Sequence, residues 1–304
     1  MSVWPPPSGA SGVGQRGLLA DHRAFDREFI LGVLVVALAM GALASLSAAM
    51  LIAVVWVDTW LLANPHLVAP YTRIVKGKGA VWRHRFLIFA LPLCVLLGVT
   101  VTALAYDIAG LFTLYFVAQT YHVARQSFGI ARAYRRVGGG PAPPDRLTQA
   151  LIYLVPGWGL LARCAQAPNA FLGYPIQWPA IPAVWADAVG VAALLCGLAW
   201  LWRFSRHWLA GQADVCHDGF VASHVVVAWV AYVAVTDITL GWLVLNSWHN
   251  LQYLLFVWAQ NVRRDQPGAR GAVRQSGADA LRTHLARYAA LCLLTGAAVF
   301  LVAD

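Results

Sequence analysis

Charge is scarce in this chain of 304 residues, because Lys, Arg, Asp and Glu together make up only 12% of it. A soluble domain of this length carries roughly twice that share, about 25%. Hydrophobic residues make up 60%, and the mean hydropathy is +0.63. The composition excludes an ordinary water-soluble domain and predicts an integral, multi-pass membrane protein.

Other absences narrow the class further. The long apolar runs show none of the two-residue alternation of a membrane barrel, so the predicted fold is an all-α, polytopic helix bundle. The five cysteines stand singly, without CxxC spacing, which excludes a disulfide framework and a thiolate metal site. The net charge is +9, but the basic residues lie between apolar runs and form no Lys/Arg-rich block. No nucleic-acid partner is therefore expected.

The number of membrane helices depends on the first apolar run, residues 29–63. A single helix of that length would reach about 50 Å, well beyond the roughly 30 Å hydrocarbon core. Two short helices with a turn near 45–48 fit better, although one helix remains the alternative. The remaining helices are predicted near 86–105, 109–131, 147–163, 183–202, 219–236, 239–262 and 281–302.

Basic residues decide between the two counts. With a hairpin at 29–63, every Lys and Arg except Arg125 and Arg163 falls on one side of the membrane. The positive-inside rule then predicts nine helices with a cytoplasmic N-terminus, against eight if the first run is one helix. Residues 1–27 are predicted to form a flexible cytoplasmic arm, and 28–304 a single membrane-embedded domain. The Pro156-Gly157 pair predicts a kinked or partly spanning helix. The oligomeric state stays open.

A polar stripe interrupts the apolar run near residues 239–261. On a helix, Asn246, His249, Asn250 and Tyr253 fall within roughly 100° of one another. Lipid offers these side chains no hydrogen-bond partner, so the stripe must face the protein interior. Polar and ionisable residues inside a membrane are functional candidates, and His249 is the first of them.

Three further histidines share the predicted depth of His249, between the middle of the membrane and its cytoplasmic face. They are His66, His122 and His224, each from a different predicted helix. Gln119, His122, Gln126 and Gly129 occupy one helical face, and Gly129 predicts a close helix approach. Asp58 precedes His66 by two turns and needs a partner, for which Arg125 or a histidine is expected.

Imidazoles from separate helices predict a metal site in the bundle core. The predicted ligands are His66, His122, His224 and His249, with Asp58 as a further ligand or base. Arg125, Gln126, Asn250 and Tyr253 are predicted to orient and polarise the substrate. A site rich in imidazole and without thiolate suits iron, zinc or copper. We favour a non-haem iron oxidase or oxygenase that acts on a lipophilic substrate from the bilayer, with membrane lipids as partners.

Other functions fit the same residues. Zinc would activate water for hydrolysis instead. Asp58, Arg125 and the histidines suit a proton-coupled transporter that uses them as a relay. A bis-histidine haem b protein would use a pair such as His122 and His249 as axial ligands. In a purely structural subunit, polar stripes only hold helices together. No HxxxH or Glu-x-x-His pattern lies in a predicted membrane helix, so no known membrane di-iron family is indicated.

Overall fold

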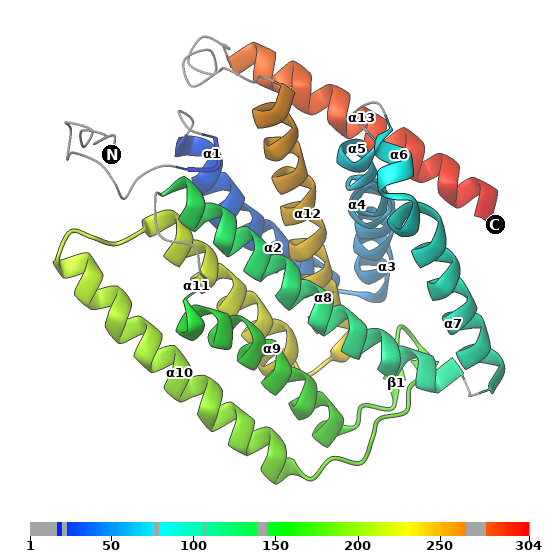
Figure 1. Cartoon of the computed structure of the whole chain (residues 1–304). Coiled ribbons are helices and arrows are strands. Elements are labelled where there is room, and N and C mark those ends of the chain that lie inside the picture. The colour runs from blue at the N-terminus through cyan, green and yellow to red at the C-terminus, as the bar shows by residue number, and fades with distance from the viewer. Residues whose placement is uncertain are drawn as a thin grey trace.

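A computed structural model describes residues 17–19, 23–75, 79–105, 108–138, 145–265 and 278–303. Within this part of the chain the structure is a bundle of long helices with one β-hairpin, each of whose strands has two residues (Figure 1). The predicted all-α class is confirmed.

Five helical segments in the described ranges are long and apolar enough to cross a membrane, which supports a membrane protein. They span Ala24–Ala44, Ala48–Ile74, Phe86–Ala105, Ala183–Leu209 and Val215–Ala234. Four further helices are also long, but their composition is more polar. They are α8 (Ile108–Val137), α9 (Arg146–Gln166), α12 (Ile238–Asp265) and α13 (Ala278–Ala303).

The first apolar run is a hairpin of two helices, as predicted. A short α1 (Arg23–Arg27) and a π-helical turn η1 (Glu28–Gly32) lead into α2 (Val33–Ala44), and α3 (Ala48–Val57) returns. Ser47 begins α3 as its N-cap, since its Oγ accepts a hydrogen bond from the Met50 backbone N–H at 3.2 Å. The turn therefore lies at residues 45–47, inside the predicted range.

The chain continues from α3 without a break into a second π-helical segment, η2 (Asp58–Ala63), and then α4 (Asn64–Val68). Short helices α5 (Tyr71–Ile74) and α6 (Ala80–Arg83) precede η3 (Phe86–Ala90) and α7 (Leu91–Ala105). None of the described residues of α7 is buried, so this helix offers its whole circumference to the surroundings. Such a helix is stable only in an apolar medium.

Helix α12 occupies the middle of the bundle (Figure 1). It packs against α2, η2 and the π-helical segment η4 (Val230–Ala234), which ends α11 (Val215–Trp229). On one side α9 packs against α8, α11 and α10 (Ala183–Leu209), and on the other α13 packs against α4. The core therefore forms around α12, the helix with the predicted polar stripe.

Helix α9 continues through Pro156, and the kinked or partly spanning form predicted there stays a prediction. Its conspicuous residue is Arg163, which is 0% exposed near the C-terminal end. The guanidinium donates to the carbonyl oxygens of Ala231 at 3.1 Å and Thr236 at 2.7 Å, and also to that of Val235. These carbonyls lie where η4 ends and lack partners within a helix. Arg163 thus secures the turn between η4 and α12.

The loop between α9 and α10 forms the β-hairpin of β1 (Ala170–Phe171) and β2 (Tyr174–Pro175), with Phe171 opposite Tyr174. Leu172 and Gly173 both have positive φ, at 50° and 82°, as a tight hairpin turn requires. Phe171 is 2% exposed, and its ring lies against those of Phe116 and Trp242. The hairpin therefore closes one end of the helix bundle.

The described part of the predicted N-terminal arm is packed rather than loose. Leu18 and Leu19 are buried at 0% and 2% exposure. The Leu18 backbone N–H donates to Asp26 Oδ1 at 2.9 Å, and the Tyr134 hydroxyl donates to the same oxygen at 3.0 Å. Residues 1–16 and 20–22 lie outside the described ranges, and so does that part of the prediction.

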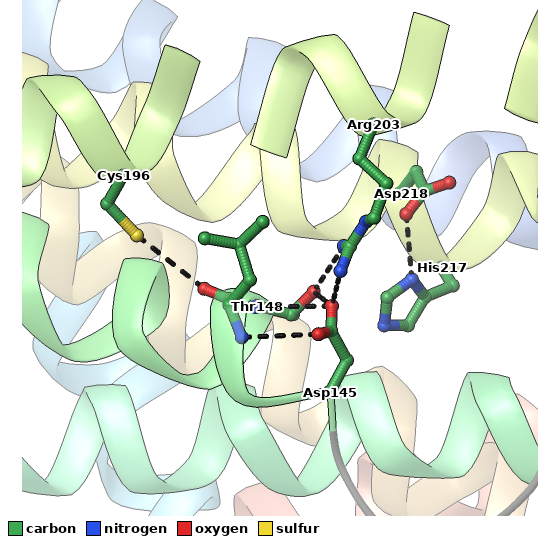
Figure 2. Close-up of polar contacts among 7 residues, drawn as sticks. Asp145, Thr148, Cys196, Arg203, His217 and Asp218 are labelled. Carbon is green, nitrogen blue, oxygen red and sulfur yellow. Dashed lines mark hydrogen bonds and ion pairs between the residues drawn. The ribbon is translucent and has the colours of Figure 1, made fainter. Parts of the chain in front are cut away.

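Polar contacts join the adjoining ends of α9 and α10, and a separate pair lies nearby on α11 (Figure 2). Asp145 is the N-cap of α9, and it forms an ion pair with Arg203 of α10. Burial alone would raise the pKa of the Asp145 carboxyl, but hydrogen bonds from Thr148 and Arg203 and the Arg203 charge hold that pKa below its ordinary value. Nearby, His217 Nδ1 donates to Asp218 Oδ1 at 2.9 Å. The contacts of Asp145 and Thr148 with Arg203 hold α9 and α10 together at this level.

Candidate functional site

Three of the four predicted histidine ligands meet in the bundle. His66 comes from α4, His122 from α8 and His249 from α12. The ring centroids are 4.8 Å apart for His66 and His249, 5.0 Å for His122 and His249, and 6.1 Å for His66 and His122. Segments separated by 56 and 127 positions in the sequence thus converge on one point.

One ring nitrogen from each of these histidines lies within 4.8 Å of the other two. Nitrogens that share one transition-metal ion lie about 2.0–2.1 Å from it and are therefore at most about 4.2 Å apart. The observed limit of 4.8 Å is somewhat wider than that separation. The group fits a three-nitrogen metal site in both ligand type and approximate geometry.

The burial of the three rings is uneven. His249 is 3% exposed, His66 is half-buried, and His122 is exposed on the outer side of α8. The candidate centre is therefore enclosed by α12 and α4 and open along one flank. In a membrane that flank faces the hydrocarbon rather than water.

Unsatisfied buried nitrogens mark the same place. Among the described residues, the Nδ1 atoms of His66 and His249 are buried without a hydrogen-bond partner. The same is true of Asn250 Nδ2, on the residue after His249. A buried polar atom without a partner costs free energy, so its presence calls for a ligand or a bound water.

A π-helical segment sets the position of His66. Between Asp58 and Ala63 the helix has the wider π turn, and α4 then begins at Asn64, with Pro65 in its first turn. Such segments shift the phase of all later side chains and are frequent at functional sites. The angle that a regular helix predicts between Asp58 and His66 therefore does not apply.

Asp58 is buried at 1% exposure, and its partners differ from those predicted. Its Oδ2 accepts from Asn246 Nδ2 at 2.5 Å, and its Oδ1 accepts from Ser247 Oγ at 2.9 Å. Neither Arg125 nor a histidine donates to it in the described contacts. Neutral donors from α12 satisfy the carboxylate because η2 packs directly on that helix.

The network extends from Asp58 towards α8. Asn246 Oδ1 accepts a hydrogen bond from Gln119 Nε2 at 3.2 Å, so one amide bridges η2 and α8. Gln119 lies one turn before His122, and Asn246 one turn before His249. The network thus fixes, one turn away, two of the helices that carry the imidazoles.

His224 lies apart from the other three histidines. It is 0% exposed, and its Nε2 donates to the carbonyl oxygen of Ile152 at 3.0 Å. Its ring packs against Trp248 with a centroid separation of 5.8 Å. This nitrogen is occupied between α9 and α11, and His224 is not part of the three-nitrogen group. The structure therefore does not support the predicted ligand role for His224.

Two residues of α8 differ from their predicted roles. Arg125 is exposed, and its guanidinium carbon lies 5.8 Å from the centre of the Phe128 ring, so it is not an interior charge. A Cβ at Gly129 would meet no other atom within 4 Å among the described residues. The predicted close helix approach at Gly129 is therefore wrong. Both positions lie on the outer side of α8, where the neighbouring helix α7 makes little contact.

The other predicted orienting residues remain near the centre. The Tyr253 ring lies 4.7 Å from that of His66. Gln126 Nε2 is buried and has no partner among the described residues. Sequence reasoning missed Ser247 and Gln252, although both lie in the polar stretch of α12. Gln252 is 0% exposed with neither amide atom hydrogen-bonded in the described part of the chain. The signal available in the sequence was the presence of these polar residues within an otherwise apolar run.

No protein family, curated protein or solved structure matches this chain.

Proposed function

We propose that this chain is an integral-membrane metalloenzyme in which His66, His122 and His249 bind one metal ion. The observation that carries the proposal is the approach of three ring nitrogens, from three different elements, to within 4.8 Å. Two of the three rings, those of His66 and His249, also carry a buried Nδ1 atom without a hydrogen-bond partner in the described structure. Asp58, which the sequence predicted as a ligand or base, now has a positioning role through Asn246.

We favour non-haem iron as the ion and oxidation of a lipophilic substrate as the reaction. Three imidazoles leave coordination positions open, which iron needs to activate oxygen. The exposed flank at His122 supports an approach from the bilayer, where apolar molecules concentrate. Tyr253, beside His66, and the amide of Asn250 are in place to orient a substrate. Zinc or copper on the same nitrogens is the alternative that metal analysis decides.

The geometry favours a bare ion over haem b. A porphyrin has to pass between two axial imidazoles, and the predicted pair of His122 and His249 lies with ring centroids only 5.0 Å apart, at 79°. The transporter alternative also loses support. Arg125 is exposed, and Asp58 has neutral partners. The relay of buried charges that it requires is not assembled among the described residues.

We further propose nine membrane spans with the N-terminus in the cytoplasm. The hairpin of α2 and α3 and the lengths of α8, α9, α12 and α13 support this count. Under this topology α4, α8 and α12 all run towards the cytoplasm. Their histidines then lie at a similar depth, and their C-terminal ends gather at one membrane surface.

Metal analysis of the purified full-length protein, together with an absorption spectrum, tests the proposed function. We expect stoichiometric iron without the Soret band of haem. His66→Ala, His122→Ala and His249→Ala should each lose the metal, while His207→Ala, at an exposed position on α10, should retain it. His224→Ala should also retain it, because its ring nitrogen binds the Ile152 carbonyl.

Two results would contradict this proposal. One is the absence of any transition metal in the wild-type protein after expression with added iron. The other is full retention of the metal by His249→Ala. Thermal unfolding of each variant in detergent separates loss of metal from loss of fold.

A further inference from the structure

A second polar site lies at the ends of the elements that carry the histidine centre. A pocket of about 450 Å³ opens between α5, α8 and α12. That volume falls within the range of ligand pockets, about 300–1,000 Å³. Its lining consists of Arg73, Ala133, Arg136, Val137, Gln260 and Arg263. Three guanidinium groups from three separate segments therefore surround one hollow.

Arg136 and Arg263 bring positive charge to this pocket. None of its described lining residues is acidic, and no ion pair involving Arg136 or Arg263 is found among the described residues. Like charges gathered around one hollow repel, and an anion placed between them would relieve that repulsion. Guanidinium groups bind phosphate through paired, parallel N–H donors, a geometry that an ammonium group lacks. The chemistry of the pocket is that of a phosphate receptor.

A hydrogen bond beside the pocket holds two of its walls together. Asn261 Nδ2 donates to Thr72 Oγ1 at 3.0 Å, which joins α12 to α5. These residues directly adjoin Gln260 and Arg73, which line the pocket. Arg73 and Arg263 are thus carried by segments with a fixed spacing. The pocket is a feature of the packed bundle, not a chance meeting of long side chains.

The position of the pocket along the helices indicates what reaches it. Arg136 follows His122 by 14 residues on α8, and Arg263 follows His249 by 14 residues on α12. On a helix this spacing corresponds to about 21 Å along the axis. A centre near the membrane middle then places the pocket at head-group level. Basic pockets between membrane helices at the cytoplasmic surface bind the phosphates of anionic lipids.

We propose that the pocket formed by Arg73, Arg136, Gln260 and Arg263 binds the phosphate group of an anionic phospholipid. Two guanidinium groups hold the phosphate oxygens, and the Gln260 amide donates to an ester or free oxygen. The lipid would join the ends of α5, α8 and α12, and so stabilise the spacing of the segments that carry the histidines. The site does not depend on a metal at the histidine centre.

The test uses the full-length protein, purified in a neutral detergent and stripped of lipid. Phosphatidylglycerol or phosphatidylcholine is added in mixed micelles, and the melting temperature is followed. Inorganic phosphate alone is a third arm. We expect the melting temperature to rise to a plateau as phosphatidylglycerol is added, and to change little with phosphatidylcholine. A comparable rise in melting temperature with inorganic phosphate would support a phosphate site in the pocket. It would also identify the ligand as free phosphate and not a phospholipid.

Variants locate the effect. Arg136→Gln with Arg263→Gln removes two exposed guanidinium groups from the pocket. We expect the lipid concentration for half-maximal stabilisation to rise at least about tenfold. Arg85→Gln with Arg206→Gln removes the same charge from exposed positions outside the pocket and should leave that concentration unchanged. Arg136→Lys, which keeps the charge without the paired donors, should weaken binding by an intermediate amount.

Two results would overturn the proposal. One is the absence of any lipid-dependent rise in the wild-type melting temperature. The other is an equal loss of stabilisation in the pocket variant and the charge-matched control, which would reveal general surface charge. Native mass spectrometry of the wild-type protein gives an independent reading, because it counts phospholipids retained after delipidation and needs no variant to fold.

Discussion

Asn246 Nδ2 lies 2.5 Å from Asp58 Oδ2, and this contact joins α12 to the π-helical segment that precedes His66. The same side chain accepts a hydrogen bond from Gln119 of α8 through its Oδ1. One amide thus connects the three segments that supply the candidate metal ligands. It explains how a buried carboxylate is tolerated without a cationic partner, since neutral donors meet both of its oxygens.

Removal of this amide should destabilise the bundle and the candidate centre together. Asn246→Ala leaves Gln119 Nε2 and Asp58 Oδ2 buried without these partners, at a cost of about 1–3 kcal/mol in the free energy of unfolding. Reversible unfolding in mixed micelles measures this loss. Gln149→Ala, at an exposed position on α9, is the control and should change stability by less than about 0.5 kcal/mol. Equal stability of both variants would contradict the bridging role.

Arg163 should be essential for stability, although it is remote from the histidines. Arg163→Gln withdraws a buried guanidinium from the carbonyls of Ala231, Val235 and Thr236. Because hydrogen bonds from charged donors contribute about 1.5–3 kcal/mol each, the expected loss is about 3 kcal/mol or more. Arg206→Gln, on an exposed arginine of α10, is the matched control. Melting temperatures of the two variants test the prediction, and a similar small shift in both would refute it.

Two glycines of α9 should respond oppositely to alanine. A Cβ at Gly159 would collide with the Cβ and ring of Tyr232, whereas a Cβ at Gly157 would meet nothing within 4 Å in the described structure. Tyr232 cannot easily yield, because its hydroxyl is hydrogen-bonded to Thr120 Oγ1 at 2.9 Å. Gly159→Ala should therefore lower the melting temperature. Gly157→Ala should leave it unchanged or raise it, since alanine favours helix by up to about 1 kcal/mol over glycine.

Acid should weaken the junction of α9 and α10. The pKa of Asp145 is lower in the folded protein than its ordinary value, so the unfolded chain takes up this proton first as the pH falls. The stabilising contribution is therefore complete above the ordinary Asp pKa and is lost as the pH falls through the depressed folded-state pKa. Asp145→Asn keeps an N-cap but loses the charge.

Unfolding of the wild type and Asp145→Asn across a pH series measures the effect of that charge. The wild type should be the more stable of the two near pH 7, and the difference between them should shrink towards zero in acid. A difference that does not change with pH would show that the ion pair with Arg203 contributes nothing to stability.

The sequence by itself determined the class of the fold and the positions at which most of the long helices begin. Long apolar runs in a membrane form helices, because backbone N–H and C=O groups in lipid have no water to bond with and must bond with one another. The turn at residues 45–47 follows from the same reasoning, since one helix through 29–63 would exceed the membrane. The sequence also predicted that the polar stripe of α12 faces the protein interior, because Asn246 and His249 find hydrogen-bond partners there and not in lipid.

Only the tertiary structure decided which polar groups meet. Sequence reasoning expected Arg125 or a histidine beside Asp58, but a helix gives the direction of a side chain only relative to its own axis. The π-helical turn at Asp58–Ala63 alters even that direction, and no sequence signal marks it. His224 shared the predicted depth of the other histidines, yet it faces α9, because depth along a helix leaves the direction of rotation undetermined. The meeting of His66, His122 and His249 depends on how the helices pack, which no single helix encodes.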